Sequence, residues 1–256
     1  MANRATLTHV GAVILAGGLG KRIGHLYPFV PKPMIEVCGF PFLEWVIRYF
    51  AGQGVAEFSL SLGYKAEIIE EYLRRRQADG LRIHSVREDI PLGTGGGFLL
   101  AAGELLSKDY LVVANGDSLI LADLLPAVEL LSQGQADAVI VGRQMEDCSR
   151  FGSLVCDDKG FLVKFSENQD GNCLINAGIY IFPKGVSAIF PRKSPLSFET
   201  DVFPGLLHSG ARVGVVESGA PFLDIGTPES VAEAEAFISA QRAKINYLWE
   251  KAKSHE

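Results

Sequence analysis

Apolar residues along the chain recur at two alternating spacings, which predict strands and helices in turn. Residues 11–16 are continuously apolar, as in a strand buried on both faces. From Phe42 to Phe50 the apolar positions recur every three or four residues, which predicts a helix that Gly52 can end. Further strands are expected at 57–62, 81–86 and 110–114, and helices at 65–77 and at 93–106, the last beginning as a glycine loop. This alternation is typical of parallel βαβ units with helices on both faces of the sheet.

The pattern changes after residue 138, where short strands follow one another. Strands are expected at 139–142, 153–156, 161–165, 175–182 and 212–216, and helices at 198–208 and 228–250. The turn Asp157-Asp158-Lys159-Gly160 predicts a hairpin. The sequence therefore predicts an α/β fold in three layers, α/β/α, around a mainly parallel mixed sheet with a β-rich second half. No linker or repeat divides the chain, so we expect one domain over residues 1–256.

Composition and charge exclude several classes of function. Lys and Arg number 24 against 30 Asp and Glu, and the longest basic run is Arg74-Arg75-Arg76, so we expect no nucleic-acid partner. No apolar run approaches the roughly 18 residues of a membrane span, so we expect no membrane partner. The four cysteines form no C-x-x-C pair, which favours reduced thiols and a cytoplasmic location.

The first predicted strand ends in a glycine turn, Gly17-Gly18-Leu19-Gly20. Such a turn lets a ligand phosphate approach backbone N–H groups and the start of the next helix. Ile23 stands where the dinucleotide fingerprint needs its third glycine, and Arg22 stands where a P-loop needs Ser or Thr. The alternative for the turn alone is a plain strand-to-helix connection that binds nothing.

Cations beside the turn favour an anionic ligand. Lys21 and Arg22 lie in the turn itself, and Lys32 follows between Pro31 and Pro33. Proline on both sides fixes the backbone in extended conformations, so Lys32 is held on a stiff segment. In an isolated Pro-Lys-Pro segment the lysine would more simply be a solvated side chain in a turn. Here the segment follows the glycine turn closely, which favours a role for Lys32 in binding the same ligand.

Two aspartates are candidates for a metal site. Asp117 follows Asn115-Gly116 at the carboxyl end of a predicted parallel strand, where open α/β sheets bind ligands. Asp224 lies in a turn much later in the chain. Each aspartate taken alone could instead stabilise a turn or cap a helix.

A series of short motifs resembles the sugar-1-phosphate nucleotidyltransferases, over about residues 11–238. Within that family the likeness is greatest to the D-glycero-D-manno-heptose 1-phosphate and mannose-1-phosphate guanylyltransferases. The motifs, in order, are Leu15-Ala16-Gly17-Gly18-x-Gly20-x-Arg22, Pro31-Lys32-Pro33-Met34, Gly63-Tyr64, Pro91-Leu92-Gly93-Thr94-Gly95-Gly96, Asn115-Gly116-Asp117, Ser149-Arg150-Phe151-Gly152, Asn176-Ala177-Gly178 and Asp224-Ile225-Gly226-Thr227-Pro228.

The resemblance implies a Rossmann-like fold and an enzyme that joins an NTP to a sugar 1-phosphate, releasing pyrophosphate and forming an NDP-sugar. It implies a nucleotide-binding half at 11–135, a sugar-binding half at 136–238, and a C-terminal helix and tail at 239–256. The implied catalytic residues are Arg22, Lys32, Asp117 and Asp224, with both aspartates as ligands of Mg²⁺. The implied nucleotide-binding residues are Leu15, Ala16, Gly17, Gly18, Gly20, Lys21, Arg22, Glu88, Gly93, Thr94, Asn115 and Gly116. The implied sugar-binding residues are Gly152, Glu167, Asn176, Ala177 and Gly178.

The sequence departs from the family at one position of the sugar site. The family commonly has Glu-Lys, with the lysine binding the sugar phosphate, whereas Glu167 is followed here by Asn168. Lys164 is four residues away, roughly 13 Å along a strand at about 3.3 Å per residue, which is too far for simple replacement. Arg143 and Arg150 are the alternative cations, and the sequence does not decide between them.

The base is indicated by Glu88, near the position where relatives contact it. A carboxylate offers two acceptors to the adjacent N–H donors of guanine, so GTP is favoured; the alternative is a solvated acid between Arg87 and Asp89. Two other functions stay open: a cytidylyl or uridylyl transferase with a nonstandard phosphorylated acceptor, and a catalytically silent protein that binds a nucleotide sugar. The oligomeric state is also open, with a homodimer as one option.

Overall fold

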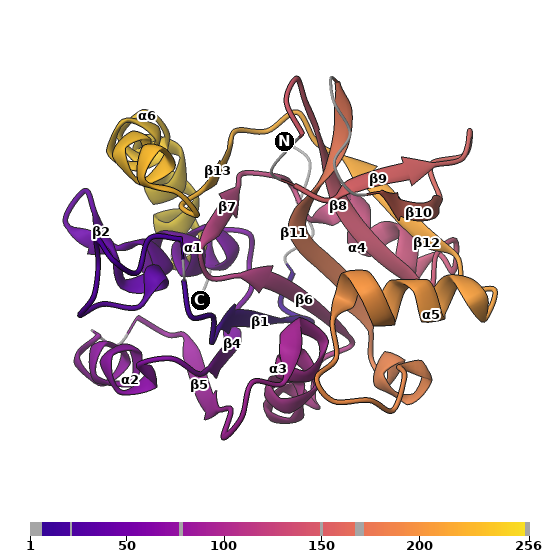
Figure 1. Cartoon of the computed structure of the whole chain (residues 1–256), viewed down its shortest axis with the longest axis horizontal. Helices are drawn as coiled ribbons and strands as arrows, with labels where there is room; N and C mark the ends of the chain where they lie inside the picture. The colour runs from indigo at the N-terminus through magenta and orange to yellow at the C-terminus, as the bar shows by residue number, and fades with distance from the viewer. Residues whose placement is uncertain (1–6, 21, 77–78, 149–150, 167–171, 254–256) are drawn as a thin grey trace.

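The computed structural model describes residues 7–20, 22–76, 79–148, 151–166 and 172–253. The first half of this chain forms the parallel part of a nine-stranded mixed sheet (Figure 1). Its strands are β1 (Val10–Ala16), β4 (Glu57–Leu62), β5 (Arg82–Arg87) and β6 (Tyr110–Asn115). β1 lies between β4 and β6, and β5 pairs with β4, all in parallel. The carboxyl ends of β1 and β6 therefore lie side by side.

The second half adds the antiparallel part of the same sheet. Its strands are β8 (Ala138–Met145), β9 (Ser153–Cys156), β10 (Leu162–Ser166), β11 (Cys173–Pro183) and β12 (Val213–Glu217). The long strand β11 runs antiparallel to β6 on one side and to β8 and β9 on the other. β12 is parallel to β8, and β10 completes a hairpin with β9. β11 thus joins the two halves into one sheet.

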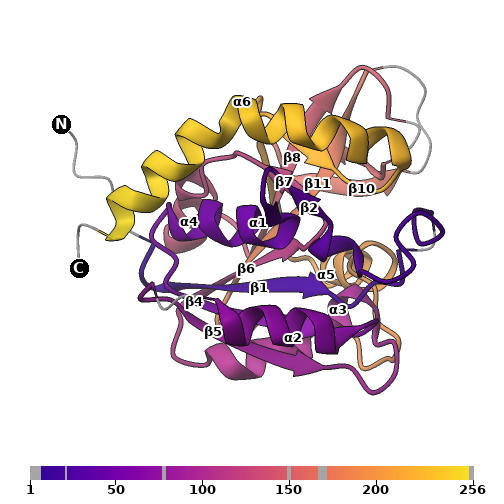
Figure 2. The same ribbon diagram turned by 90° about the vertical axis from the view of Figure 1, so that its left-hand side faces the viewer.

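Helices cover both faces of the sheet. One core holds buried residues of α1 (Phe42–Ala51), α2 (Ala66–Arg75), α4 (Leu125–Ser132) and α6 (Pro228–Lys253). The other holds those of α3 (Gly93–Ala102) and α5 (Phe203–His208). Successive residues of β1 serve the two cores in turn: Ala12 and Ile14 face the first, and Val13 faces the second. The outermost helix, α6, crosses over α1 (Figure 2).

Short elements connect the longer strands and helices. Two small antiparallel ribbons form: β7 (Ser118–Ile120) with β13 (Phe222–Asp224), and β2 (Glu36–Val37) with β3 (Phe40–Pro41). Short 3₁₀ helices cover Lys32–Met34, Gly103–Leu105 and Val186–Ile189, and a π-helix covers Phe198–Val202. Elements of two or three residues are too short for hydrophobic periodicity to reveal.

The predicted three-layer fold and mixed sheet are confirmed, and the predicted strands lie within a few residues of the observed ones. Two predictions on helices need correction. The helix at 93–106 does not begin as a loop, because α3 already starts at Gly93. The helix at 198–208 consists of a π-helical and an α-helical part. The sequence analysis missed α4, and the end of the predicted 65–77 helix lies outside the described residues.

The expectation of four reduced cysteines is wrong for two of them. Cys148 and Cys173 form a disulfide in the structure, at a sequence separation of 25. The fold brings the loop after β8 against the start of β11, a tertiary contact that cysteine spacing does not reveal. Within the described ranges, no helix combines the length and the apolar character that a bilayer span requires.

Candidate active site

The glycine turn continues β1 past its end and is packed against the next βα connection. Leu15 and Ala16 close the strand, and the Gly17 carbonyl accepts a hydrogen bond of 3.2 Å from the Tyr64 N–H. A β-carbon at Gly63 would lie 2.7 Å from that carbonyl oxygen, so only glycine fits there. Gly18 has open space around it. Lys21 lies outside the described residues.

The turn also makes room for Lys32. Gly20 has φ +57°, and a β-carbon there would lie 3.5 Å from Cγ of Lys32, so the lysine stem runs along the turn. Pro31 precedes the 3₁₀ helix Lys32–Met34 and Pro33 is buried within it, which fixes the backbone that carries the lysine. Nζ of Lys32 donates to Oδ2 of Asp117 at 2.6 Å. The sequence pattern and the structure agree on a lysine held toward the edge of the sheet.

The two predicted metal aspartates are brought together by the β7–β13 ribbon. Asp224 pairs with Ser118, and the Ile225 N–H donates to the Asp117 carbonyl at 3.0 Å. The Asp224 side chain folds back so that Oδ1 accepts from the Gly226 N–H at 2.9 Å. A β-carbon at Gly226 would lie 2.4 Å from this Oδ1 and 3.5 Å from Nζ of Lys32. Both aspartates and the lysine therefore meet at one place.

Asn115 and Gly116 connect this cluster to β1 and β11. The Gly116 N–H donates to the Leu15 carbonyl at 2.8 Å, which turns the chain over the end of β1. In β11 the pairing register shifts between Asn176 and Ile179, as in a β-bulge. Gly178, with φ +74°, sits in this bulge, where a β-carbon would lie 2.6 Å from Nδ2 of Asn115. Gly178 is thus needed for the close approach of the two strands.

Glu88 lies beside the glycine turn with its carboxylate already bonded on both oxygens. Oε1 accepts from the Ser61 hydroxyl at 2.8 Å, and Oε2 accepts from the Leu92 N–H at 2.9 Å. A β-carbon at Gly17 would lie 3.0 Å from Oε1, and one at Gly97 would lie 2.8 Å from it. The two glycines give the carboxylate its space, so it faces the region that the turn borders.

Gly93 and Thr94 anchor the start of α3 to a distant segment. Gly93 has φ +79°, and a β-carbon there would lie 2.5 Å from the Leu196 carbonyl oxygen. That oxygen accepts from the Gly95 N–H at 2.8 Å. The Thr94 hydroxyl accepts from the Phe198 N–H at 3.0 Å. These bonds tie the predicted nucleotide loop to the π-helix Phe198–Val202.

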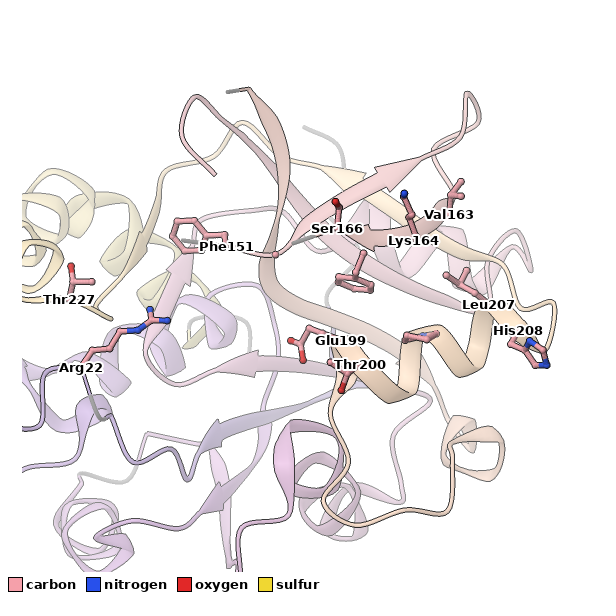
Figure 3. A pocket seen from close by; sticks show the side chains of 13 residues that line it. Arg22, Phe151, Val163, Lys164, Ser166, Glu199, Thr200, Leu207, His208 and Thr227 are labelled. Atoms are coloured by element: carbon pink, nitrogen blue, oxygen red, sulfur yellow. The ribbon is translucent and has the colours of Figure 1, made fainter. Parts of the chain in front are cut away.

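A cavity of about 1070 Å³ lies over the β-rich half (Figure 3), and Lys32, Asp117 and Asp224 are not among the residues that line it. Arg22 and Thr227 line one end of it, and Gly152 also lines it. The Arg22 side chain is exposed and points into this space in the close-up view. Asn176, Ala177 and Gly178 are not among the lining residues. Glu167 and Asn168 lie outside the described residues.

The candidate cations for the acceptor phosphate have different surroundings. Arg143 donates through Nη1 to the Ala220 carbonyl. Lys164, judged too far from position 168 for direct replacement, nevertheless lines the cavity on β10. Arg150 lies outside the described residues. Of the two that the structure describes, Arg143 and Lys164, Lys164 is the one on the cavity wall.

Sequence analysis missed Glu199, which lines the same cavity. Its carboxylate accepts from the buried Tyr180 hydroxyl at 2.9 Å. Asn176 donates to the same hydroxyl at 2.8 Å, so this predicted sugar residue is engaged inside the protein. Ser197, a helix N-cap with acidic residues soon after it, was the available sequence signal.

A parallel sheet with a glycine turn and a lysine–aspartate cluster at its carboxyl edge is typical of α/β proteins that bind phosphorylated ligands. The nucleotidyl transferase family model matches residues 11–241, and the chain belongs to this family. It is 34% identical over 227 residues to the D-glycero-alpha-D-manno-heptose 1-phosphate guanylyltransferase of Aneurinibacillus thermoaerophilus, covering 88% of this chain and 96% of that protein. It is 35% identical over 233 residues to the mannose-1-phosphate guanylyltransferase of Mycobacterium tuberculosis, covering 90% of this chain. The chain spans only 65% of that mycobacterial protein.

A solved structure gives the same result for the fold. The crystal structure of HddC from Yersinia pseudotuberculosis complexed with GMP-PN superposes with a TM-score of 0.77 at 32% sequence identity. The match covers 88% of this chain and 98% of that one. The predicted Rossmann-like architecture is thereby confirmed over most of the chain.

Proposed function

We propose that this protein transfers a guanylyl group from GTP to a heptose or mannose type sugar 1-phosphate. The observation that carries the proposal is the meeting of Lys32, Asp117 and Asp224 at the end of the glycine turn, beside a cavity large enough for a sugar phosphate. Both similar proteins named above are guanylyltransferases of such sugars. The related crystal structure holds GMP-PN.

The proposed reaction is an in-line displacement at the α-phosphorus. A phosphate oxygen of the sugar 1-phosphate forms the new bond to that phosphorus, and the bond to the β-phosphate oxygen breaks, so pyrophosphate leaves with the electron pair. Such a step depends on positioning and charge neutralisation more than on an acid or base. Lys32 would neutralise charge at the α-phosphate, and Arg22 would stabilise the departing pyrophosphate. Backbone groups of Gly17, Gly18 and Gly20 would surround the triphosphate.

The carboxylates present fit a magnesium ion. Mg²⁺ is usually held by one or two carboxylates together with substrate phosphates and water. Asp117 immediately precedes β7 and Asp224 ends the paired strand β13, so the two residues supply two carboxylates. The described residues contain no group of three or more metal-binding side chains that would suit an all-protein site. When bound, the ion would offset negative charge on the phosphates. We therefore assign Mg²⁺ to these two aspartates.

Glu88 supports the choice of guanine. Its carboxylate is fixed by Ser61 and Leu92, and each oxygen keeps one further acceptor position. Two fixed acceptors suit the adjacent N1–H and N2–H₂ donors of guanine. Gly93, Thr94, Asn115 and Gly116 would then complete the nucleotide side by shaping the loops that border it.

The proposal is tested by pyrophosphate release with Mg²⁺ across the four NTPs and a panel of hexose and heptose 1-phosphates. We expect release with GTP and a manno-configured sugar 1-phosphate, and a GDP-sugar by mass spectrometry. Pyrophosphate release with CTP or UTP but not with GTP would show that the base is cytosine or uracil and not guanine. NTP binding without turnover on the whole panel would favour a silent nucleotide-sugar-binding protein. The expected homodimer and cytoplasmic location stay predictions, to be tested by light scattering and by cell fractionation.

A further inference from the structure

Glu199 occupies the wall of the cavity between the Arg22 end and the far end on β10 and α5. It belongs to the π-helix Phe198–Val202, an uncommon conformation that is frequent at functional sites. In the close-up view its carboxylate is turned toward the side of the cavity where Arg22 lies (Figure 3). A carboxylate placed there is in position to meet a bound acceptor.

Two hydroxyl donors fix the Glu199 carboxylate from the protein side. The Tyr180 hydroxyl donates to Oε1 at 2.9 Å, and the Ser197 hydroxyl donates to Oε2 at 2.9 Å. The Ser197 oxygen also accepts from the backbone N–H groups of Glu199 and Thr200, at 3.2 and 3.3 Å. These bonds orient Ser197 so that its proton points to the carboxylate.

Tyr180 is held in the same direction by residues behind it. Its side chain is only 1% exposed, and burial together with the negative charge of Glu199 raises the pKa of Tyr180 well above 10. The hydroxyl therefore keeps its proton as a donor. Nδ2 of Asn176 donates to the Tyr180 oxygen at 2.8 Å, and Oδ1 of Asn176 accepts from the Gly178 N–H at 3.0 Å. The hydrogen bonds thus run in one direction, from the Gly178 N–H to Asn176, from Asn176 to Tyr180, and from Tyr180 to Glu199.

The arrangement leaves Glu199 with acceptor positions for a ligand. An ionised carboxylate has about four acceptor positions and no donor, and two positions are used by Tyr180 and Ser197. One acceptor position on each oxygen is then not used by these two partners. Groups that satisfy both are two donors spaced like hydroxyls on neighbouring carbons of a sugar ring.

We propose that Glu199 determines acceptor specificity by accepting hydrogen bonds from two adjacent hydroxyls of the sugar 1-phosphate. Tyr180, Ser197 and Asn176 are positioning residues that hold its carboxylate. The proposal rests on the proposed function, because it takes the acceptor to be a sugar phosphate. It also gives Asn176 a different role from the expected direct contact with the sugar.

The test compares the wild type with Glu199→Gln, which keeps the shape but places a donor where the sugar needs an acceptor. Loss of hydrogen bonds to a charged group predicts a fall of about 10- to 100-fold in kcat/KM for mannose 1-phosphate. The KM for GTP should not change. In the wild type, two monodeoxy analogues lacking neighbouring hydroxyls should each react at least about 10-fold less well than the parent sugar, and this difference should shrink in the variant.

The matched control is Asp158→Asn, which changes an exposed carboxylate in the β9–β10 hairpin. It should keep the kinetics of the wild type. Tyr180→Phe should raise the KM for the sugar phosphate, and its effect should not add to that of Glu199→Gln. Unchanged acceptor kinetics in Glu199→Gln, or equal loss with every analogue and with GTP, would overturn the proposal.

Failure of the proposed function can be told apart from failure of this inference. If the wild type turns over no GTP and sugar phosphate pair, the guanylyl-transfer proposal fails. Titration calorimetry with mannose 1-phosphate and its deoxy analogues, at saturating nonhydrolysable GTP, then decides the role of Glu199. Tighter binding of the parent sugar in the wild type, lost in Glu199→Gln, supports it. Equal binding of all sugars, or no sugar binding at all, contradicts it.

Discussion

Nζ of Lys32 lies 2.6 Å from Oδ2 of Asp117, and the two side chains are 15% and 29% exposed. The lysine comes from a proline-held segment after the glycine turn, whereas the aspartate follows the central strand β6. Their contact joins the cationic and the anionic part of the candidate site. Asp117 therefore has a cationic partner within the protein, and an incoming metal ion and phosphate would share both groups.

Asp117→Asn should nearly abolish turnover while leaving the fold intact. An amide is a weaker ligand for a hard cation, and loss of several kcal/mol of charge stabilisation corresponds to roughly a 1,000-fold fall in kcat. Pyrophosphate release measures the rate, and circular dichroism checks the fold. The exposed Asp158 in the β9–β10 hairpin gives a matched control, since Asp158→Asn should keep full activity. Near-normal turnover in Asp117→Asn would remove the metal assignment.

Gly226→Ala should weaken metal binding without touching a ligand directly. A β-carbon at Gly226 would lie 2.4 Å from Oδ1 of Asp224, so the carboxylate must move away from its present place. We expect the Mg²⁺ concentration for half-maximal rate to rise about 10-fold or more, as for loss of support behind a metal ligand. Gly219→Ala is the control, because a β-carbon at Gly219 meets nothing within 4 Å. An unchanged Mg²⁺ dependence would mean that Asp224 is not a ligand.

The parallel half of the fold was predictable because its elements are long and regular. Continuous apolar runs identified β1 and β6, and the stripe from Phe42 to Phe50 identified α1 within a residue of its observed ends. The short ribbons were not predictable, since β7 and β13 have three residues each and are held by pairing across the chain. The meeting of Asp117 and Asp224 depends on that ribbon, so it followed from the resemblance and not from periodicity.

The predicted sugar-binding residues stay predictions, and the structure adds contacts that the sequence did not reveal. Asn176 was expected to contact the sugar, yet both ends of its amide are bonded inside the protein, to Tyr180 and Gly178. The bulge in β11 that produces this arrangement leaves no periodic signal in the sequence. Glu199 reaches the cavity because the Phe198–Val202 segment packs against the start of α3, a contact between residues about one hundred positions apart.

Glu88→Gln should relax the choice of base if Glu88 reads guanine. Gln can still accept from the Leu92 N–H and meet the Ser61 hydroxyl, so the local fold should persist. The preference for GTP over the other NTPs should fall by roughly 10- to 100-fold, because one of the two acceptors becomes a donor. Pyrophosphate release with each NTP measures the preference, and the neighbouring Asp89→Asn serves as the control. An unchanged preference would leave Glu88 with a structural role only.

The buried Glu44 should make the stability of the protein depend on acid pH. Its carboxylate joins α1 to α2 through Arg76 at 2.9 Å and Tyr72 at 2.8 Å. Burial alone would raise the pKa of Glu44, but Arg76, together with Arg48 and Tyr72, outweighs it and holds the pKa below its usual value of 4.5. A lowered pKa in the folded state adds stability above the unfolded pKa, and this stability is lost as pH falls through the folded pKa.

Glu44→Gln should therefore lower the free energy of unfolding by about 3 kcal/mol at pH 7, because Arg76 loses a buried partner. The difference in the free energy of unfolding between variant and wild type should become smaller as pH falls below about 4.5. In that range Glu44 is protonated in the unfolded wild-type chain before it is protonated in the folded protein. Urea unfolding between pH 3 and 7 measures both. Glu71→Gln, which removes a carboxylate paired with the exposed Arg74 and Arg75, should cost less than about 1 kcal/mol. If the loss of unfolding free energy in Glu44→Gln did not depend on pH, packing and not ion pairing would account for the effect of the substitution.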